Sequence, residues 1–338
     1  MQPPKVVLVL SGGLALGAYQ AGAYAALHAH GTRPEHLAGV SIGAVNAALI
    51  AGGEPRDEVE RLRAFWDAAR LEPLSSPADW MLADTGPWRY GRNWLSVLQA
   101  RALGNAAVFR PTLGSATAIY DLAPLRATME RLVDFRRLND GAMRIAVLAT
   151  DLDAGVEVVF DTGKGERIGL EHVLASCGFL PEFPPVEIDG RLLGDGGLTA
   201  NAPVEPALLG HGGGRDVLCF VVDLFPADGP RPATLEQAAA RRVDLLLGAQ
   251  TRQALRRLER EHRLRPDGER PRVKILHLRH RAGPREAAPE KHFDFSRATL
   301  AERWEAGCLD MAEAIALAAG DGHPQTRGSR GVLLSSWS

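Results

Sequence analysis

Residues 38–53 read AGVSIGAVNAALIAGG, and this stretch contains the pattern G-x-S-x-G with its serine at Ser41. The short apolar residues before Ser41 are typical of a strand end, and the small residues 44–51 predict a helix that ends at a pair of glycines. A serine between the two lies on a sharp turn, where Gly39 and Gly43 let neighbouring backbone pass closely. The hydroxyl then projects at a helix N-terminus, which makes Ser41 a candidate nucleophile. Alternatively, the small residues serve only to let helix and strand pack closely.

A second unit of strand, loop and helix precedes this one. Residues 6–10 read VVLVL, a continuous apolar run typical of a parallel strand that is buried on both faces. The run ends at a glycine-rich loop, residues 11–13, and residues 17–30 predict a helix of small residues. Loops of this kind present backbone N–H groups to an anion beside the positive end of a helix.

Three kinds of anion site compete for this loop. A dinucleotide-binding loop requires G-x-G-x-x-G, but the chain reads GGLALG from Gly12, and no acidic residue follows at the expected distance. A Walker loop requires Gly-Lys followed by Ser or Thr, which the sequence lacks. The third kind is an oxyanion hole, in which loop amides face the charge that develops on a carbonyl oxygen. It is favoured because a candidate nucleophile follows on the next strand-turn-helix unit.

The rest of the chain alternates predicted strands and helices. Helices are expected at 56–70, 121–133, 169–176, 233–265 and 296–319, and strands at 144–150, 156–161, 188–193, 216–224 and 273–278. This alternation predicts an α/β fold with a mainly parallel central sheet that is covered by helices on both faces.

The expected organisation is one domain over residues 5–320. Residues 72–120 differ from the remainder, because they are rich in Pro and Gly and contain Trp80, Trp88 and Trp94. They predict a Trp-rich cap insertion, whose rings suit an apolar ligand or a lipid interface. The alternative is that the rings fill a small local core. Residues 321–338 are expected to form a disordered tail.

The composition is that of an ordinary globular protein, with 46% hydrophobic and 24% charged residues. A net charge of −2 provides no general attraction to nucleic acid. The sequence contains no apolar run of transmembrane length, and the run at 6–10 is too short for a signal peptide. Three cysteines cannot form a closed disulfide framework, so we expect a cytoplasmic protein, with contact at a membrane surface left open. No motif indicates a metal or a cofactor.

A candidate base follows much later in the chain. Asp195 stands at the end of a predicted strand, with Gly194 before it and Gly196 and Gly197 after it. Reacting groups in α/β sheets gather beyond the carboxyl ends of strands, so Asp195 can share an edge with Ser41. A desolvated carboxylate is a stronger base than its free pKa suggests, as general-base catalysis requires. The alternative is an Asp in an ordinary turn.

Taken in order, the glycine-rich loop, G-x-S-x-G and Asp-Gly-Gly resemble the motifs of the patatin-like phospholipase family, in particular a bacterial branch of it. The resemblance runs from Val6 to about Pro203 and includes residues 175–186, which are similar to the family's stretch before its catalytic aspartate. It implies a three-layer α/β/α fold and a Ser–Asp dyad, with Ser41 as nucleophile and Asp195 as general base. The amides of Gly12, Gly13 and Leu14 would form the oxyanion hole.

The activity that this resemblance implies is hydrolysis of lipid acyl esters, of the phospholipase A or lysophospholipase type, through an acyl-enzyme and without cofactor. The substrate is then a lipid or acyl ester, which can lie at a membrane surface. The loop departs from the family where Leu14 and Leu16 replace a glycine and a cation. Because Leu14 resists positive φ, we expect the loop to use ordinary dihedrals. The missing cation leaves open whether phospholipid or a neutral ester is preferred.

Other interpretations remain open at this stage. The same dyad would serve an esterase or thioesterase acting on other esters or on stored polyesters, and the fold alone would serve a lipid-binding regulatory protein with little turnover. A Ser-Asp-His hydrolase would need a histidine after the acid, where His277, His280 and His292 are available. Cys177, near the proposed dyad in sequence, is expected to be a small packed residue.

Overall fold

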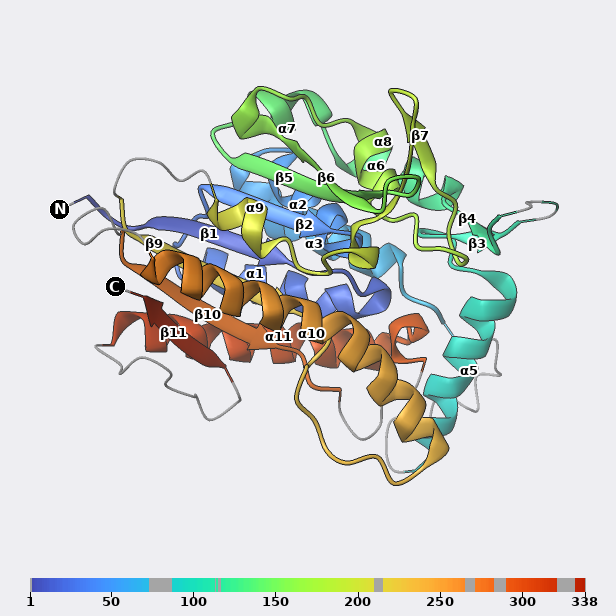
Figure 1. Ribbon diagram of the computed structural model, residues 1–338. Helices are drawn as coiled ribbons and strands as arrows, with labels where there is room; N and C mark the ends of the chain where they lie inside the picture. The colour runs from blue at the N-terminus through green and yellow to red at the C-terminus, as the bar shows by residue number, and fades with distance from the viewer. Residues whose placement is uncertain are drawn as a thin grey trace.

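The computed structural model describes residues 2–72, 87–112, 114, 117–209, 215–264, 271–282, 290–320 and 332–337. Within these residues, a nine-stranded sheet runs through the molecule and helices cover both of its faces (Figure 1). The three-layer α/β/α arrangement expected from the sequence is therefore confirmed.

The strands of this sheet follow the order β11-β10-β9-β1-β2-β5-β8-β7, and β6 pairs with β5. The adjacent strands β10, β9, β1, β2 and β5 are parallel, whereas the pairs β10–β11, β5–β6, β5–β8 and β7–β8 are antiparallel. Their bounds are β1 Lys5–Leu10, β2 His36–Val40, β5 Arg144–Asp151, β6 Val156–Asp161, β7 Val186–Ile188, β8 Arg191–Asp195, β9 Val217–Asp223, β10 Val273–Arg279 and β11 Leu333–Trp337. A separate pair is formed by β3 Arg110–Pro111 and β4 Tyr120–Asp121.

Most helices lie close to the ranges that the sequence predicts, whereas the helices at Pro87–Leu103, Phe135–Asp140 and Val204–Leu208 were not predicted. The helices are α1 Ala18–Ala29, α2 Ile42–Ala51, α3 Glu58–Ala68, α5 Pro87–Leu103, α6 Ala123–Leu132, α7 Phe135–Asp140, α8 Leu170–Ala175, α9 Val204–Leu208, α10 Leu235–Arg263 and α11 Arg297–Ala319. Short 3-10 helices are η1 Leu14–Gly17, η2 Pro55–Asp57, η3 Thr162–Lys164, η4 Gly196–Leu198 and η5 Lys291–Phe293.

The pleat of β1 shows how the sheet is buried. Leu8 and Leu10 point into the larger core with α1, α2 and α11, whereas Val7 and Val9 point into a second core with α9 and α10. All four side chains are buried, as the continuous apolar run predicts.

Two glycines let α1 and α11 cross in close contact. A Cβ at Gly22 would lie 1.9 Å from the carbonyl oxygen of Trp304, and a Cβ at Gly307 would lie 1.9 Å from that of Tyr19. The two helix backbones therefore touch directly, which larger side chains would prevent.

The C-terminal end differs from the expected disordered tail. Residues 333–337 form β11, which pairs antiparallel with β10 from Val273 to His277. Without β11, the edge of β10 would present unpaired backbone N–H and C=O groups. A short C-terminal strand is enough to form hydrogen bonds with them. The remainder of the expected tail, apart from Val332, lies outside the described residues.

The expected cap is described only in part. Residues 73–86, 113, 115 and 116 lie outside the described residues, as do the side chains of Trp80 and Trp88. The described remainder contains α5 and the β3–β4 pair, and Trp94 packs partly buried against the main core. Among the described residues, no helix has both the length and the apolar character needed to cross a membrane.

Candidate active site

Ser41 lies on the sharp turn that its motif predicts. It follows β2 directly, caps α2 and has φ 54° and ψ −125°, a conformation that strongly favours glycine. A Cβ at Gly39 would lie 2.5 Å from the carbonyl oxygen of Gly43, and a Cβ at Gly43 would lie 2.2 Å from that of Leu10. Both glycines are therefore required for the close crossing of β1, β2 and α2.

Asp195 comes to Ser41 by a route that differs from the one expected. Its strand β8 runs antiparallel to β5, so its end does not follow from the common direction of the parallel strands. β2 pairs with β5 only as far as Leu148, and β8 pairs with β5 from Ala149 onward. β6 occupies the other side of β5. The carboxyl ends of β2 and β8 therefore meet end to end along one side of β5.

The carboxyl group of Asp195 is buried, with 2% of the residue exposed. Burial raises its pKa from 3.8 to about 7, while hydrogen bonds from the Ser41 side chain and from the Gly197 amide lower it by less. The Gly197 N–H donates to Asp195 Oδ1 over 2.7 Å. This places a serine hydroxyl against a carboxyl group that ionises near neutral pH.

Cys177 also lies in this cluster. Burial raises the pKa of its thiol, the charge of Asp195 raises it further, and a hydrogen bond with Ser41 opposes both. The thiol is therefore protonated and packed, in agreement with its expected role as a small buried residue.

The loop after β1 differs in two ways from the expected oxyanion hole. The Gly12 N–H donates to the Asn201 carbonyl over 2.9 Å, so it is already engaged. Leu14 has φ 50°, in the left-handed region, although ordinary dihedrals were expected. The chain must turn at once from β1 into η1, and packing of the Leu14 side chain on the core compensates for this strain. Within the described part of the chain, the amides of Gly13 and Leu14 have no hydrogen-bond acceptor.

Two side chains that position these groups were not predicted from the sequence. Ser176 is fully buried; its Oγ accepts from the Ser41 N–H over 2.9 Å and donates to the Leu148 carbonyl over 2.6 Å. Asn201 lies between Gly12 and Gly197, since a Cβ on either glycine would come within 2.9 Å of Asn201 Oδ1. Ser176 lies within residues 175–186 and Asn201 follows Asp-Gly-Gly, but nothing in the sequence indicates these contacts.

The histidines that a triad would require have other contacts. His277 Nε2 lies 3.3 Å from Asp223 Oδ2, and the rings of His280 and His292 pack on those of Tyr19 and Phe293. Among the residues that the structure describes, no group of three or more His, Cys, Asp or Glu side chains could hold a metal ion.

The sequence was compared with protein-family models. Residues 8–208, which carry the loop, the serine turn and Asp195, match the model described as patatin-like phospholipase. The chain belongs to the patatin-like phospholipase family. Residues 233–326 of this patatin-like chain match a second model, described as patatin phospholipase. The family supports a lipid acyl hydrolase activity in general terms, with a lipid as substrate.

Among solved structures, the patatin-like chain is similar to VipD from Legionella pneumophila, with 13% identity and a TM-score of 0.37. The match covers 90% of this chain and 67% of that chain. A comparison with curated proteins found no match.

Proposed function

We propose that this patatin-like chain is a serine hydrolase that cleaves lipid acyl esters, of the phospholipase A or lysophospholipase type, with Ser41 as nucleophile and Asp195 as base. The observation that carries the proposal is that β2 and β8 meet end to end along β5, which brings the Ser41 side chain to the buried carboxyl group of Asp195, whose pKa burial raises to about 7. A base with a pKa near the working pH can both accept and return a proton.

In the first half of the proposed reaction, Ser41 Oγ attacks the ester carbonyl carbon and Asp195 accepts the hydroxyl proton. The carbonyl π electrons move to the oxygen, and a tetrahedral oxyanion forms. When the oxyanion collapses, the bond to the leaving alcohol breaks, and that alcohol takes the proton from Asp195. The acyl group is then esterified to Ser41.

In the second half, water attacks the acyl-enzyme. Asp195 accepts a proton from the water, and the second tetrahedral intermediate expels Ser41 Oγ, which recovers its proton from Asp195. The products are the free acid and the restored enzyme, so atoms and charge balance without a cofactor.

The amides of Gly13 and Leu14 are the proposed donors to the oxyanion in both halves. Each such donor typically contributes about 2.7–4 kcal/mol to lowering the barrier. The Gly12 N–H is not a proposed donor to the oxyanion, because it already donates to the Asn201 carbonyl and so holds the loop against Asn201.

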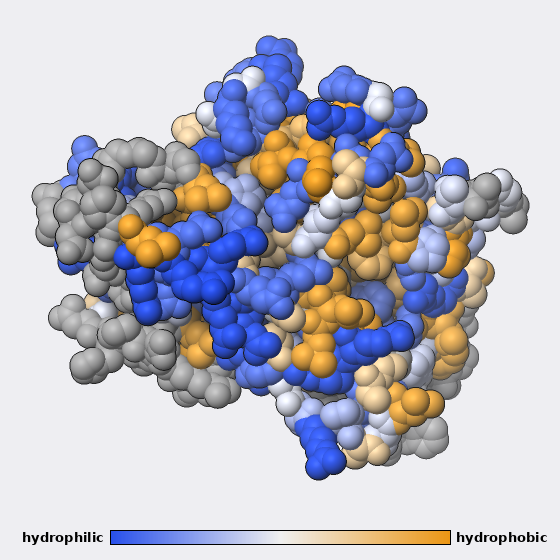
Figure 2. Space-filling view, in the orientation of Figure 1, coloured by the Kyte–Doolittle hydropathy of each residue, from blue (hydrophilic) through white to orange (hydrophobic). Residues whose placement is uncertain are grey.

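An apolar surface supports a lipid substrate. Figure 2 shows hydrophobic side chains gathered over the middle and right of the face seen in Figure 1, with hydrophilic side chains around them. Leu198, three residues after Asp195, and Leu192 in β8 are each 39% exposed. An acyl chain can be shielded from water against such side chains.

A neutral ester is the second candidate substrate. Leu16, at the position where the family's loop carries a cation, is fully buried, and Leu14 packs against the core. These two loop positions therefore contribute no positive charge that would select an anionic headgroup. An esterase or thioesterase acting on other acyl esters would use the same two residues.

The experiment is to incubate the purified chain with a fluorophosphonate probe and, separately, with phospholipid, lysophospholipid, monoacylglycerol and acyl-CoA. We expect labelling that disappears in Ser41→Ala, and hydrolysis that falls by about 10²–10⁴-fold in Asp195→Asn. Asp223→Asn, which removes the carboxylate beside His277, is the matched control and should retain activity. Full activity in Asp195→Asn with loss in Asp223→Asn would refute the dyad. Lipid binding without probe labelling would instead indicate a regulatory protein with little turnover.

A further inference from the structure

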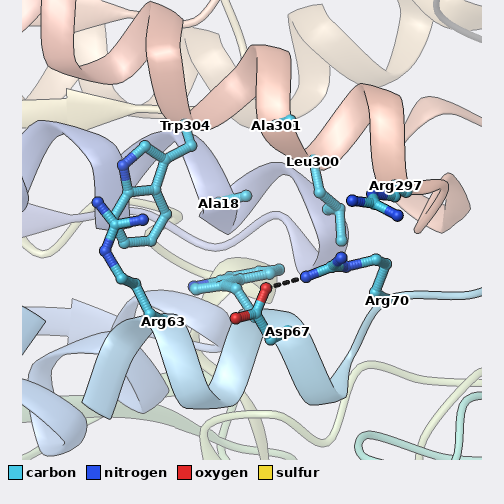
Figure 3. Close-up of a pocket in the computed structure, with 9 residues that line it drawn as sticks. Ala18, Arg63, Asp67, Arg70, Arg297, Leu300, Ala301 and Trp304 are labelled. Atoms are coloured by element: carbon cyan, nitrogen blue, oxygen red, sulfur yellow. Dashed lines mark hydrogen bonds and ion pairs between the residues drawn. The ribbon is translucent and has the colours of Figure 1, made fainter. Parts of the chain in front are cut away.

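A pocket of about 310 Å³ lies between α3 and α11 over the start of α1 (Figure 3). From α3 and the residues just after it, the lining side chains are Arg63, Trp66, Asp67 and Arg70. This spacing of three, four and seven residues places them on one side of a helix. The α11 lining repeats the same spacing from Arg297, so two matching helix faces enclose the pocket.

The pocket has an excess of positive charge. It is lined by the guanidinium groups of Arg63, Arg70 and Arg297 and by a single carboxylate, that of Asp67. Asp67 forms an ion pair with Arg70. Within the described residues, neither Arg63 nor Arg297 forms an ion pair. Guanidinium groups bind phosphate through paired, charge-assisted hydrogen bonds, so this charge arrangement suits an anion.

The remaining walls are apolar. Leu300 and Trp66 are buried, and the Arg63 guanidinium lies over the Trp304 ring at 4.7 Å from its centre. In Figure 3, Arg70 and Arg297 lie at one end of the pocket, and Arg63 with Trp304 lies at the other. A ligand that fills it therefore combines an anionic group with an apolar body.

Buried hydrogen bonds hold the pocket in one shape. Trp66 Nε1 donates to Asn46 Oδ1 over 3.1 Å, and Asn46 Nδ2 donates to Gln20 Oε1 over 3.0 Å. Gln20 Nε2 in turn donates to the Ser11 carbonyl over 2.8 Å. The indole therefore has a fixed orientation before any ligand arrives, which lowers the entropy cost of binding.

We propose that this pocket is a binding site for a phosphate ester with an apolar body. The phosphate lies between Arg70 and Arg297, and the apolar body covers Leu300 and Trp304. The same chemistry is found in a nucleoside monophosphate and in a single-chain lysophosphatidate. Neither Ser41 nor Asp195 lines the pocket, so this site is separate from the proposed dyad.

The test is calorimetric titration of the full chain carrying Ser41→Ala, which prevents turnover. The ligands are inorganic phosphate, adenosine monophosphate, hexanoyl-lysophosphatidate and monohexanoylglycerol, the phosphate-free counterpart. We expect one or both phosphate esters to bind at least about tenfold more tightly than inorganic phosphate or the neutral ester. Tighter binding of adenosine monophosphate would identify a soluble metabolite, and tighter binding of lysophosphatidate would identify a lipid headgroup.

The variant Arg297→Gln should weaken this binding about tenfold or more, because a charge-assisted contact is lost. Arg56→Gln is the matched control, since the Arg56 side chain is 86% exposed and lies outside the pocket. Circular dichroism would verify that both variants are folded. The proposal is overturned if neither phosphate ester shows saturable binding, or if Arg297→Gln and Arg56→Gln bind equally well.

Discussion

Replacing Asp195 by Asn should stabilise the protein, and more so at high pH. The buried carboxyl group has a pKa of about 7 when folded, against an ordinary value of 3.8, so the folded chain holds a proton that the unfolded chain has released between these values. Unfolding is therefore increasingly favoured as the pH rises through this window. The two pKa values differ by about three units, and each unit corresponds to about 1.36 kcal/mol. The free energy of unfolding is therefore about 4 kcal/mol lower above pH 7 than below pH 3.8 on account of this one group.

Asparagine removes this cost, because it has no charge to bury. Its side-chain oxygen can still accept from the Gly197 N–H, as Asp195 Oδ1 does. We expect the free energy of unfolding of Asp195→Asn to exceed that of the unmodified chain by about 4 kcal/mol at pH 8.5. The difference should fall to about 1.5 kcal/mol at pH 5, because the folded chain there keeps the carboxyl protonated only about 1.2 pH units above its ordinary pKa of 3.8.

The assay is urea denaturation of both chains at the two pH values. The slopes of the free energy of unfolding against urea concentration are compared, to ensure that the same transition is measured. Asp153→Asn, in the exposed turn between β5 and β6, is the control and should change stability by less than about 0.5 kcal/mol at either pH. Equal stabilities of Asp195→Asn and the unmodified chain at pH 8.5, or a difference that does not depend on pH, would refute the reasoning. A stability gain with loss of hydrolysis is the pattern expected of a catalytic group.

Three further predictions follow from the same structure. Because the proposed base must be ionised, kcat/KM for ester hydrolysis should rise with pH through about 7, and a plateau reached already at pH 5 would contradict the raised pKa of Asp195. Ser176→Ala should lower the free energy of unfolding by about 2 kcal/mol, since two buried hydrogen bonds are lost, and should reduce kcat more than it changes KM. Gly22→Ala should destabilise by more than about 2 kcal/mol, because its Cβ would meet the α11 backbone, whereas Gly91→Ala in α5, with open space around it, should stabilise by about 0.5–1 kcal/mol. Denaturation curves for these two glycine variants that coincide would contradict the close crossing of α1 and α11.

The sequence by itself determined the features that depend on neighbouring residues. The strand-turn-helix at Ser41 was predictable because small residues and two glycines are the local requirement of such a turn. The apolar run of β1 predicted a strand buried on both faces, and the alternation of strands and helices predicted the layered fold. Each of these follows from short-range sterics and periodicity.

Only the tertiary structure decided how distant segments meet. β8 could have paired along β5 in another register. Its end meets Ser41 because β2 pairs with β5 only as far as Leu148 and leaves the rest of β5 free on that side. The left-handed conformation of Leu14, the Ser176 contacts and strand β11 likewise depend on what packs or pairs beside them. Which distant strands pair, and in which register, depends on how all the strands and helices of the chain compete to pack against one another. A local sequence pattern does not encode the result of that competition.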